Sequence, residues 1–449
     1  MSAINEVNPF KCLRYEKNNV NDIGLCLAPP YDVISPLMQQ YYYDLHECNV
    51  IRLILGKEYI TDNDSDNRYT RAFQTLTGWI QKGVLTETVE PSFWVYEQTF
   101  NDSNNCEKQI KGFIGLVRLQ DYNTDAVLPH EKVMKRVVDD RVNLMSATNT
   151  QTEYIWSLFE DPSNQIDIVL DGKRSFEQPE ISYFENSQKT KHRLWQIKQK
   201  KECNIISEVM KGQKIYIADG HHRYQTMLSF RDEMRRKFPD AGPSAPWEFI
   251  LMFLTNIEQP GLTILPTHRI LNKINTLGVQ GFEQRLSKFF SLEKYYFTQK
   301  DQTDVLKVWI KDLNETEEKH KLGIFSRKLN CYYIVTLNNI IGYEKLISDK
   351  GSDVWRNLDV NILNVLILNE ILGIDETQLN EGKVIQYTND IEEGLSEVRK
   401  GNAEIAFFLN PTKISEVIKV SNNQELMPRK STHFYPKPIS GLLFYPMNQ

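Results

Sequence analysis

The order of apolar and polar positions predicts a chain in which helices and strands alternate. Ser35-Pro36 has the N-cap and first-turn pattern of a helix, which we expect over 37–47, and a second helix is expected from about 66 to 82. Two runs rich in aromatic and β-branched residues follow at 93–100 and 111–119. These runs predict two antiparallel strands joined by a polar loop.

The middle of the chain continues this alternation. A helical pattern begins after His130 and runs to about 147. The expected strands are then 154–159, 166–170, 193–197, 214–218 and 247–255, and the expected helices between them are 203–210 and 222–237. The last of these strands is almost entirely apolar, which is typical of a strand covered on both faces.

Two further segments are assigned from their apolar residues. The run Asn49–Leu53 is expected to be a strand that carries Arg52. The run Val360–Leu372 is expected to be an apolar helix with Asp359 as its cap. Beyond about residue 272 the pattern again alternates helices with strands, so the sequence as a whole predicts an α/β or α+β fold.

Length and composition indicate a globular protein of several domains. The 449 residues correspond to two or three domains, and 41% of them are hydrophobic. A net charge of −6 and a pI of about 5.9 argue against nucleic acid as the main partner. No apolar run approaches the ~20 residues that cross a bilayer. The N-terminus lacks a signal-peptide pattern, so we expect a cytoplasmic protein with no membrane partner.

The sharpest chemical signal is Asp219-Gly220-His221-His222-Arg223. This segment follows an apolar strand and opens a helix, where free N–H groups and the helix dipole favour a phosphate or a carboxylate. Gly220 lets the backbone approach a ligand, and Arg223 offers a fork of donors to phosphate oxygens. The two histidines can transfer protons near neutral pH, and Asp219 is a candidate to hold Mg²⁺ or to orient a histidine. The alternative is a turn whose polar residues only cap the helix.

A second signal is His130-Glu131-Lys132, followed downstream by Arg141. Glu131 is a candidate general base that removes a proton from a hydroxyl nucleophile. Lys132 and Arg141 are candidates to stabilise the charge of a transferring phosphoryl group. The alternative is a helix start in which Glu131 complements the helix dipole.

Two more motifs combine basic side chains with hydroxyl or aromatic neighbours. His268-Arg269 follows an apolar stretch, and the C-terminal segment 427–438 is dense in basic, hydroxyl and aromatic residues. Such a segment can close over an anionic ligand, whereas ordinary chain ends are mobile and carry no chemistry. The candidate substrate or lid residues are His130, His268, Arg269, Lys430, Ser431, Thr432 and Lys437.

Seven motifs occur in order along the chain: APPYDVIS, NVIRLILGK, LPHEKV with a downstream DDR, IADGHHRY, LPTHRIL, LDVNIL and MPRKSTHFYPKPISGL. Together they resemble the bacterial domain-of-unknown-function family 1015 over residues 8 to 445. DGHHR also resembles the second box of the ParB/sulfiredoxin-like fold, in which this turn binds nucleotide phosphates. By motif, the chain is similar to the free serine kinases, which phosphorylate L-serine with ATP or ADP.

The resemblance implies a central ParB/sulfiredoxin-like unit at 110–271, with an N-terminal α/β section at 1–109 and a C-terminal α/β section at 272–449. It implies a nucleotide-dependent kinase that phosphorylates a small hydroxyl metabolite, with free L-serine as the first candidate and Mg²⁺ with ATP or ADP as cofactors. Carried over by motif, Glu131 is the base. The residues implied to bind phosphates and metal are Asp219, Gly220, His221, His222 and Arg223, and the assisting cations are Lys132 and Arg141.

Other functions are compatible with the same motifs. They are a regulatory switch that binds CTP or ATP without phosphorylating a metabolite, a nucleotide or phosphoester hydrolase, and a metabolite-binding scaffold. The acidic charge and the missing helix-turn-helix signal disfavour a DNA-bound switch. The sequence leaves open the acceptor, the nucleotide and the oligomeric state, for which a homodimer is one option. It also leaves open whether the C-terminal motif reaches the active centre.

Overall fold

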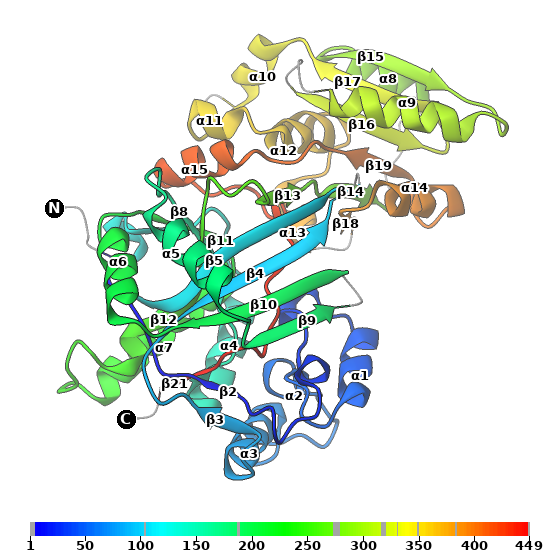
Figure 1. Ribbon diagram of the computed structural model, residues 1–449. Coiled ribbons are helices and arrows are strands. Elements are labelled where there is room, and N and C mark those ends of the chain that lie inside the picture. Colours follow the sequence, from blue (N-terminus) through cyan, green and yellow to red (C-terminus); the bar gives the residue numbers. More distant parts are fainter. Residues whose placement is uncertain are drawn as a thin grey trace. The chain divides into compact units, whose positions relative to one another are not determined.

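The computed structural model describes residues 5–102, 105–185, 189–272, 279–315, 320–329, 331–347, 350–381 and 384–447. The chain forms two compact units, and Figure 1 labels most of their strands and helices. Unit 1 combines Met1–Thr263 with Pro436–Gln449, and unit 2 is Ile264–Tyr435. The chain therefore builds most of unit 1, then unit 2, and returns to unit 1 with its last residues.

Unit 1 is built on a mixed sheet with the strand order β6-β11-β8-β12-β5-β4-β10-β9, and β1 pairs with β5. The strand bounds are β1 Val7–Asn8, β4 Phe93–Asn101, β5 Glu107–Arg118, β6 Val127–Leu128, β8 Ile155–Phe159, β9 Ile181–Glu185, β10 Thr190–Ile197, β11 Ile215–Asp219 and β12 Phe249–Asn256. The β6–β11 and β8–β12 pairs are parallel, and β4 and β5 form the antiparallel pair expected from the sequence. Helices and a mixed sheet share one unit, so the expected α/β class is confirmed.

Two helices of unit 1, α1 and α3, begin at a side-chain cap that the local sequence supplies. The bounds of the helices in this unit are α1 Pro36–Leu45, α2 Ile51–Ile54, α3 Arg68–Gln81, α4 Lys135–Thr148, α5 Gln165–Phe176, α6 Lys200–Met210 and α7 His221–Lys237. The Ser35 hydroxyl accepts a hydrogen bond from the Met38 N–H, and Pro36 occupies the first turn of α1, as the sequence predicts. Asn67 and Thr70 form a reciprocal capping box at the start of α3.

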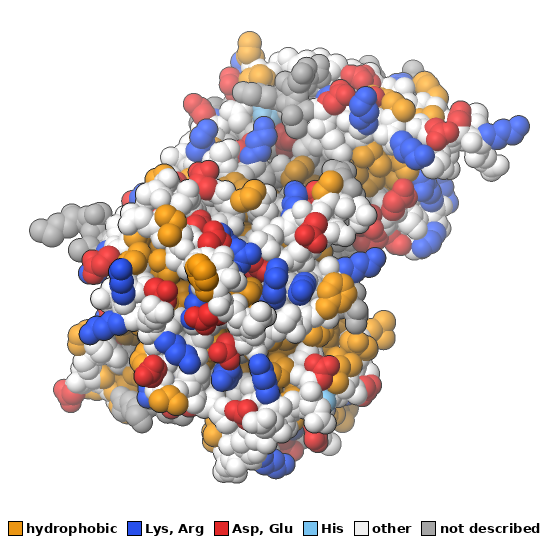
Figure 2. All heavy atoms as spheres, viewed as in Figure 1, with side chains coloured by type: hydrophobic (Ala, Val, Ile, Leu, Met, Phe, Trp, Pro, Cys, Tyr) orange, Lys and Arg blue, Asp and Glu red, His pale blue; other side chains and the backbone are white. Residues whose placement is uncertain are grey.

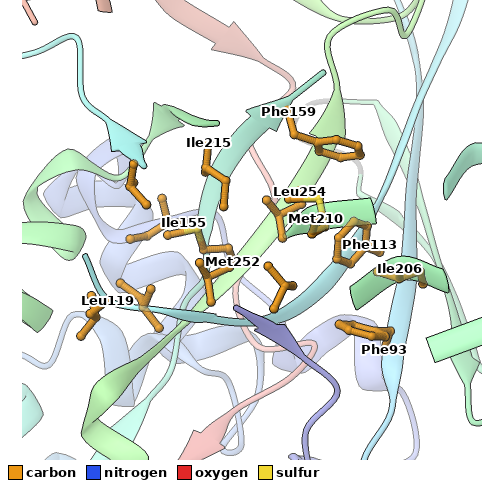
Figure 3. Close-up of a cluster of buried hydrophobic side chains, with 14 of the residues drawn as sticks. Phe93, Phe113, Leu119, Ile155, Phe159, Ile206, Met210, Ile215, Met252 and Leu254 are labelled. Carbon is orange, nitrogen blue, oxygen red and sulfur yellow. The ribbon is translucent and has the colours of Figure 1, made fainter. Parts of the chain in front are cut away.

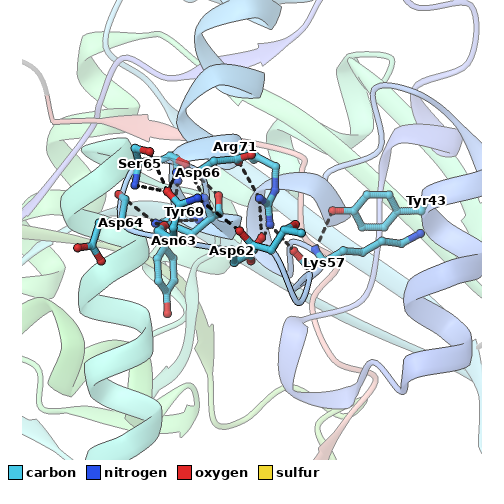
Figure 4. A network of polar contacts seen from close by, with 12 residues as sticks. Tyr43, Lys57, Asp62, Asn63, Asp64, Ser65, Asp66, Tyr69 and Arg71 are labelled. Atoms are coloured by element: carbon cyan, nitrogen blue, oxygen red, sulfur yellow. Dashed lines mark hydrogen bonds and ion pairs between the residues drawn. The ribbon is translucent and has the colours of Figure 1, made fainter.

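A polar network fixes the loop that leads into α3 (Figure 4). Arg71 forms ion pairs with Asp62 and Asp66, and it also donates to the Lys57 carbonyl oxygen. The Lys57 N–H in turn donates to the Tyr43 hydroxyl oxygen on α1. The Arg71 guanidinium thus ties the loop to α3 and, through Lys57, to α1.

The apolar core of unit 1 lies between the central strands and the helices that cover them (Figure 3). Phe113, Ile155 and Met252 come from β5, β8 and β12, and each is at most 1% exposed. Ile206 and Met210 bring α6 onto the same cluster. Every residue of β12 is buried, which agrees with a strand covered on both faces.

Two short apolar runs form helices, so the strands expected there are wrong. In the run 49–53 the helix α2 begins at Ile51, and 166–170 lies inside α5. Periodicity does not separate a short buried strand from a short buried helix, so neighbouring contacts decide. The Asn49 side chain accepts a hydrogen bond from the Ile51 N–H, which favours a helical turn at this point.

Unit 2 contains an antiparallel sheet with the strand order β15-β17-β16-β19-β14-β18. The strand bounds are β14 His268–Leu271, β15 Phe290–Tyr296, β16 Lys321–Ser326, β17 Cys331–Leu337, β18 Ile385–Thr388 and β19 Ile405–Phe408, and β13 Thr263–Leu265 pairs separately with β20 His433–Tyr435. The helix bounds are α8 Val279–Leu286, α9 Gln302–Asn314, α10 Ile340–Ile347, α11 Asp353–Arg356, α12 Asp359–Ile362, α13 Glu376–Glu381, α14 Ile391–Lys400 and α15 Ile414–Asn422.

The apolar helix expected over 360–372 is present in unit 2 as α12, which continues as a π-helix over Leu363–Ile371. Asp359 is not its cap, which corrects the expectation from the sequence. Leu358 occupies the N-cap position without a side-chain hydrogen bond, and Asp359 lies in the first turn. The Asp359 carboxylate is instead 2.9 Å from His320 Nδ1.

Candidate functional site

The turn between β11 and α7 is a single residue, Gly220. Its φ of 101° is a conformation that L side chains rarely adopt. A Cβ at this position would also lie 3.1–3.2 Å from the guanidinium atoms of Arg223. The absence of a side chain therefore lets the strand turn into the helix and lets Arg223 fold back over the turn. Gly220 supplies no side-chain cap, so the positive end of the α7 dipole carries no capping oxygen from this residue.

Arg223 is held by three groups in unit 1. Its guanidinium donates to the Asp219 carboxylate and to the Tyr154 carbonyl oxygen, each at 2.7 Å, and lies 4.0 Å from the Glu153 carboxylate. Burial disfavours the charged form, but the carboxylates of Glu153, Asp219 and Asp32 outweigh it and raise the pKa of Arg223. The side chain is 13% exposed, so a permanent positive charge lies just below the surface.

The C-terminal segment of unit 1 places a second cation, Lys437, beside Asp219. Lys437 Nζ forms an ion pair with the carboxylate oxygen that Arg223 does not use. Gln98 donates to the Lys437 carbonyl oxygen at 3.1 Å, and Ser440 exchanges two backbone hydrogen bonds with Ala28. These bonds hold the segment against unit 1 and place a lysine 218 positions away in sequence against the strand end.

The carboxylates and cations of this site compensate one another. Burial acts to raise the pKa of Asp219, but Lys437 and Arg223 hold it well below its usual range. Burial acts to lower the pKa of Lys437, but Asp219 and Asp32, the latter 3.9 Å away, raise it. Asp219 therefore fixes the positions of two cations that face one another across a single carboxylate.

The two histidines hold a neighbouring backbone segment in place. β6 runs parallel to β11, so the residues that follow β6 lie beside the start of α7. The His130 N–H donates to His221 Nε2 at 3.2 Å, and the Met134 N–H donates to His222 Nε2 at 3.0 Å. Since each Nε2 accepts a hydrogen bond, that atom carries no proton and each ring is neutral in this arrangement.

Burial keeps His130 and His221 uncharged. His130 and His221 pack edge to face with ring centroids 4.5 Å apart, and each is at most 4% exposed. Burial lowers the pKa of His130 to about 4 and, together with the neighbouring His130, lowers that of His221 well below its ordinary value. The two rings therefore act as neutral hydrogen-bonding groups at physiological pH.

Glu131 and Lys132 lie between the two anchored residues His130 and Met134. Glu131 is partly buried and Lys132 is exposed. The backbone that carries the candidate base is thus fixed on both sides against the first turn of α7. Both residues also take part in further interactions.

Arg141 lies on α4 and belongs to a second charged group. Its guanidinium pairs with Asp140 and donates to the Ile54 carbonyl oxygen at 2.6 Å, while its centre lies 4.2 Å from the centroid of the Tyr31 ring. Asp140 also pairs with Arg68 from α3. Arg141 is therefore anchored by its own neighbours rather than by Asp219.

A small cavity lies between Arg141 and Arg223. Its volume is about 40 Å³, and Glu153, Gln151 and Thr226 also contribute to its wall. A cavity of this size holds a few water-sized atoms, which is far less than the ~300 Å³ of a typical small-molecule pocket. In this conformation it therefore admits one end of a ligand and not a whole nucleotide.

Three residues near Arg223 were not expected from the sequence as site residues. Glu153 accepts hydrogen bonds from the Tyr31 N–H at 3.3 Å and from the Ser440 hydroxyl at 3.1 Å. Burial raises the pKa of Glu153, and Arg223 opposes this effect. Asp32 approaches Lys437. Tyr31 and Asp32 belong to the APPYD motif, which local pattern indicates only as a stiff turn, and Glu153 carries no local signal.

The residues do not fit a metal ion bound by the protein alone. Among the described residues, no group of three or more His, Cys, Asp or Glu side chains has an arrangement that suits a metal. Asp219, the metal ligand expected from the sequence, has both carboxylate oxygens occupied by Lys437 and Arg223. The observed role of this carboxylate is to pair with cations of the protein.

The other lid candidates belong to unit 2. His268 and Arg269 lie on β14, and both are at most 2% exposed. The Ser431 carbonyl oxygen accepts a hydrogen bond from the Thr412 hydroxyl at 2.8 Å. The remaining candidates in this unit are Lys430 and Thr432. Of the C-terminal candidates, the structure places Lys437 in the unit that contains Asp219.

The described helices and the visible surface agree with the composition. None of the helices in the described ranges combines the length and the apolar character that a bilayer crossing requires. Figure 2 shows acidic and basic side chains interspersed over the visible face, without an extended area of one sign.

Three solved structures match this chain over most of their own length. A free serine kinase in complex with AMP is 11% identical, with a TM-score of 0.33 over 71% of this chain and 86% of that chain. SbnI with a C-terminal truncation, from Staphylococcus aureus, is 9% identical, with a TM-score of 0.35 over 74% and 87%. A conserved hypothetical protein from Pyrococcus furiosus is 11% identical, with a TM-score of 0.32 over 72% and 90%.

The family of the chain follows from its sequence. No curated protein shows significant sequence similarity to it. The family described as "Protein of unknown function (DUF1015)" matches residues 7–361, which include the Asp219–Arg223 turn and the segment that the histidines hold. Since this match covers most of the chain, the protein belongs to the DUF1015 family.

Proposed function

We propose that unit 1 transfers the terminal phosphoryl group of a nucleotide to the hydroxyl group of a small metabolite. ATP or ADP is the proposed donor, and free L-serine is the acceptor that we favour. The observation that carries the proposal is the pair of hydrogen bonds from the His130 and Met134 N–H groups to the two histidines. They hold the backbone of Glu131 beside a helix start that suits phosphate.

The proposed phosphate site consists of the first turn of α7 with Arg223 and Lys437. Two cations and the positive end of a helix dipole lie together there, and each favours a phosphate oxygen. In the structure both cations pair with Asp219. An incoming phosphate would share them with this carboxylate, so Asp219 keeps the cations in place before the nucleotide arrives.

The proposed reaction uses Glu131 as the general base. Glu131 takes the proton from the acceptor hydroxyl, the hydroxyl oxygen forms a bond to the terminal phosphorus, and the bond from phosphorus to the bridging oxygen breaks. The shortened nucleotide leaves with that electron pair. Because their rings are neutral acceptors, His221 and His222 are assigned to positioning the Glu131 segment, while Lys132 and Arg141 supply additional positive charge.

Magnesium accompanies nucleotides in most phosphoryl transfers. Because both Asp219 oxygens already contact cations, the residues at this turn offer the metal no open carboxylate oxygen. Asp219 is therefore assigned to holding the two cations and not to binding a metal.

The test is a turnover and binding experiment with ATP, ADP or CTP and a panel of free hydroxy amino acids. We expect a phosphorylated amino acid from the wild type, and loss of turnover with retained nucleotide binding in Glu131→Gln. Asp139→Asn, which removes an exposed acid on the neighbouring helix α4, is the matched control and should keep full activity. Arg223→Ala should weaken nucleotide binding while the fold remains intact.

Three results would overturn the proposal that the protein is a kinase. Nucleotide binding without turnover would instead indicate a regulatory switch, and release of inorganic phosphate regardless of the amino acid would indicate a hydrolase. Unchanged nucleotide affinity in Arg223→Ala would remove the assigned phosphate site.

A further inference from the structure

Two motifs that the proposed function does not use meet inside unit 2. Arg269 lies on β14, and Lys430 follows it by 161 positions in the sequence. The Arg269 guanidinium donates to the Lys430 carbonyl oxygen at 3.0 Å and also to the Thr267 carbonyl oxygen. The LPTHR and MPRKST segments therefore converge on one buried cation.

In the part of the chain that the structure describes, Arg269 has no acidic partner. It is 2% exposed, and among the described residues its hydrogen bonds go only to those two neutral carbonyl oxygens. Burial lowers the pKa of Arg269 to about 10, and the group that acts in the opposite direction is the Tyr387 hydroxyl rather than a carboxylate. Arg223 in unit 1 shows the contrast, because three carboxylates raise its pKa.

Arg269 borders a cavity of about 20 Å³ whose wall belongs entirely to unit 2. Such a volume holds one or two water-sized atoms. Thr267 also borders the cavity, and its hydroxyl accepts a hydrogen bond from the Asn389 amide at 3.4 Å, so the hydroxyl proton is available for another acceptor. Two residues with hydrogen-bond donors therefore line a space the size of one carboxylate or phosphate edge.

Two acidic residues in the same wall are engaged elsewhere. The Asp359 carboxylate lies 2.9 Å from His320 Nδ1, and Glu416 accepts the Lys413 N–H at 2.8 Å. Burial raises the pKa of Glu416, which favours its neutral form. Neither acid forms an ion pair with the guanidinium of Arg269 among the described residues.

We infer that Arg269 and Thr267 form a binding site in unit 2 for an oxyanion, carried by a carboxylate or a phosphate group at the end of a small ligand. The physical reason is the destabilisation of the fold when no ligand is bound. A buried guanidinium without a counter-charge destabilises the fold, and proteins pair such charges or use them to bind a ligand. This inference does not rest on the phosphotransfer proposal, because it concerns another unit and is tested by binding alone.

The test compares the full-length chain with Arg269→Met and with the matched control Lys430→Ala, which removes an exposed side chain but keeps the carbonyl oxygen that Arg269 uses. All three proteins also carry Arg223→Ala, so that phosphate binding in unit 1 does not contribute. The protein that carries only Arg223→Ala is the background protein. Melting temperatures are measured without ligand and with inorganic phosphate, acetate or L-serine, against sodium chloride at equal ionic strength. The phosphate and carboxylate arms distinguish the two sources of the oxyanion.

We expect at least one oxyanion to raise the melting temperature of the background protein and of Lys430→Ala, but not of Arg269→Met. Without ligand, Arg269→Met should melt at the same temperature as the background or higher, because the substitution removes an uncompensated buried charge. A clear loss of stability in unliganded Arg269→Met would show that the arginine serves the fold and would overturn the inference. The inference also fails if no oxyanion stabilises the background protein or if Arg269→Met keeps the ligand effect.

Discussion

Replacement of Lys437 by methionine tests whether the C-terminal segment is part of the unit 1 site. The substitution keeps an unbranched side chain that is one heavy atom shorter, and it removes the charge. Lys437 and Asp219 are 9% and 15% exposed, so their ion pair is largely desolvated. Asp219 would retain Arg223 as its one remaining cation.

The size of the effect follows from this geometry. Removing one partner of a buried pair costs about 3–5 kcal/mol, and we expect about 3 kcal/mol here because Arg223 still compensates Asp219. For a unit of this size that corresponds to a fall in melting temperature of about 6–10 °C. Lys237→Met is the matched control, because its ion pair with Glu233 is 57% and 32% exposed and contributes at most about 1 kcal/mol.

Thermal and urea unfolding of the two variants provide the comparison, and the double variant Asp219→Asn/Lys437→Met completes a double-mutant cycle. We expect the double variant to be less destabilised than the sum of the single variants, since each single change leaves a buried charge behind. If Lys437→Met loses no more stability than Lys237→Met, or if the two changes are additive, the reasoning about this pair is refuted.

Three other perturbations test separate parts of the structure. Glu97→Gln should destabilise the protein by about 3 kcal/mol in urea unfolding, since Glu97 is fully buried and pairs with both Arg174 and Arg193; a change below about 1 kcal/mol would contradict this. Gly220→Ala should cost about 1–2 kcal/mol and weaken nucleotide binding, because φ is +101° there and the new methyl group meets the Arg223 guanidinium; a melting temperature equal to wild type would argue against it. The pKa of His130 is about 4 in the folded state against 6.5 ordinarily, so the unfolded state binds the proton first and stability falls as pH drops from about 6.5 toward about 4. The slope should reach about 1.4 kcal/mol per pH unit for this group and should be smaller in His130→Gln.

Local pattern predicted the elements whose signals lie within a few residues. The helix that starts at Pro36 has its cap and its proline adjacent in sequence, and the β4–β5 pair consists of two long runs of β-forming residues. The start of α7 was expected within one residue, because Gly220 ends the strand and the polar run begins a helix. By contrast, 49–53 and 166–170 are short apolar runs, and their helical form depends on contacts that sequence pattern does not report.

The candidate site was predictable only in part, because its residues come from distant segments. Arg223 and Asp219 were found since they stand in one motif with a physical meaning of its own. Glu153 was missed because a single acid before a buried strand looks like an ordinary turn residue. Its role appears only when Tyr31 and Ser440, from opposite ends of the chain, donate to it.

The separation of these residues along the sequence also gives a reason why the last residues of the chain return to unit 1. Asp219 at the end of β11 can hold Arg223 from its own helix, but a second cation on the other carboxylate oxygen has to come from elsewhere. The segment Pro436–Gln449 supplies this second cation, and it follows the whole of unit 2 in the sequence. A chain that lacks this segment would keep the turn at Gly220 but leave Asp219 without its Lys437 partner, so the complete charge pattern forms only when the C-terminal segment has folded onto unit 1.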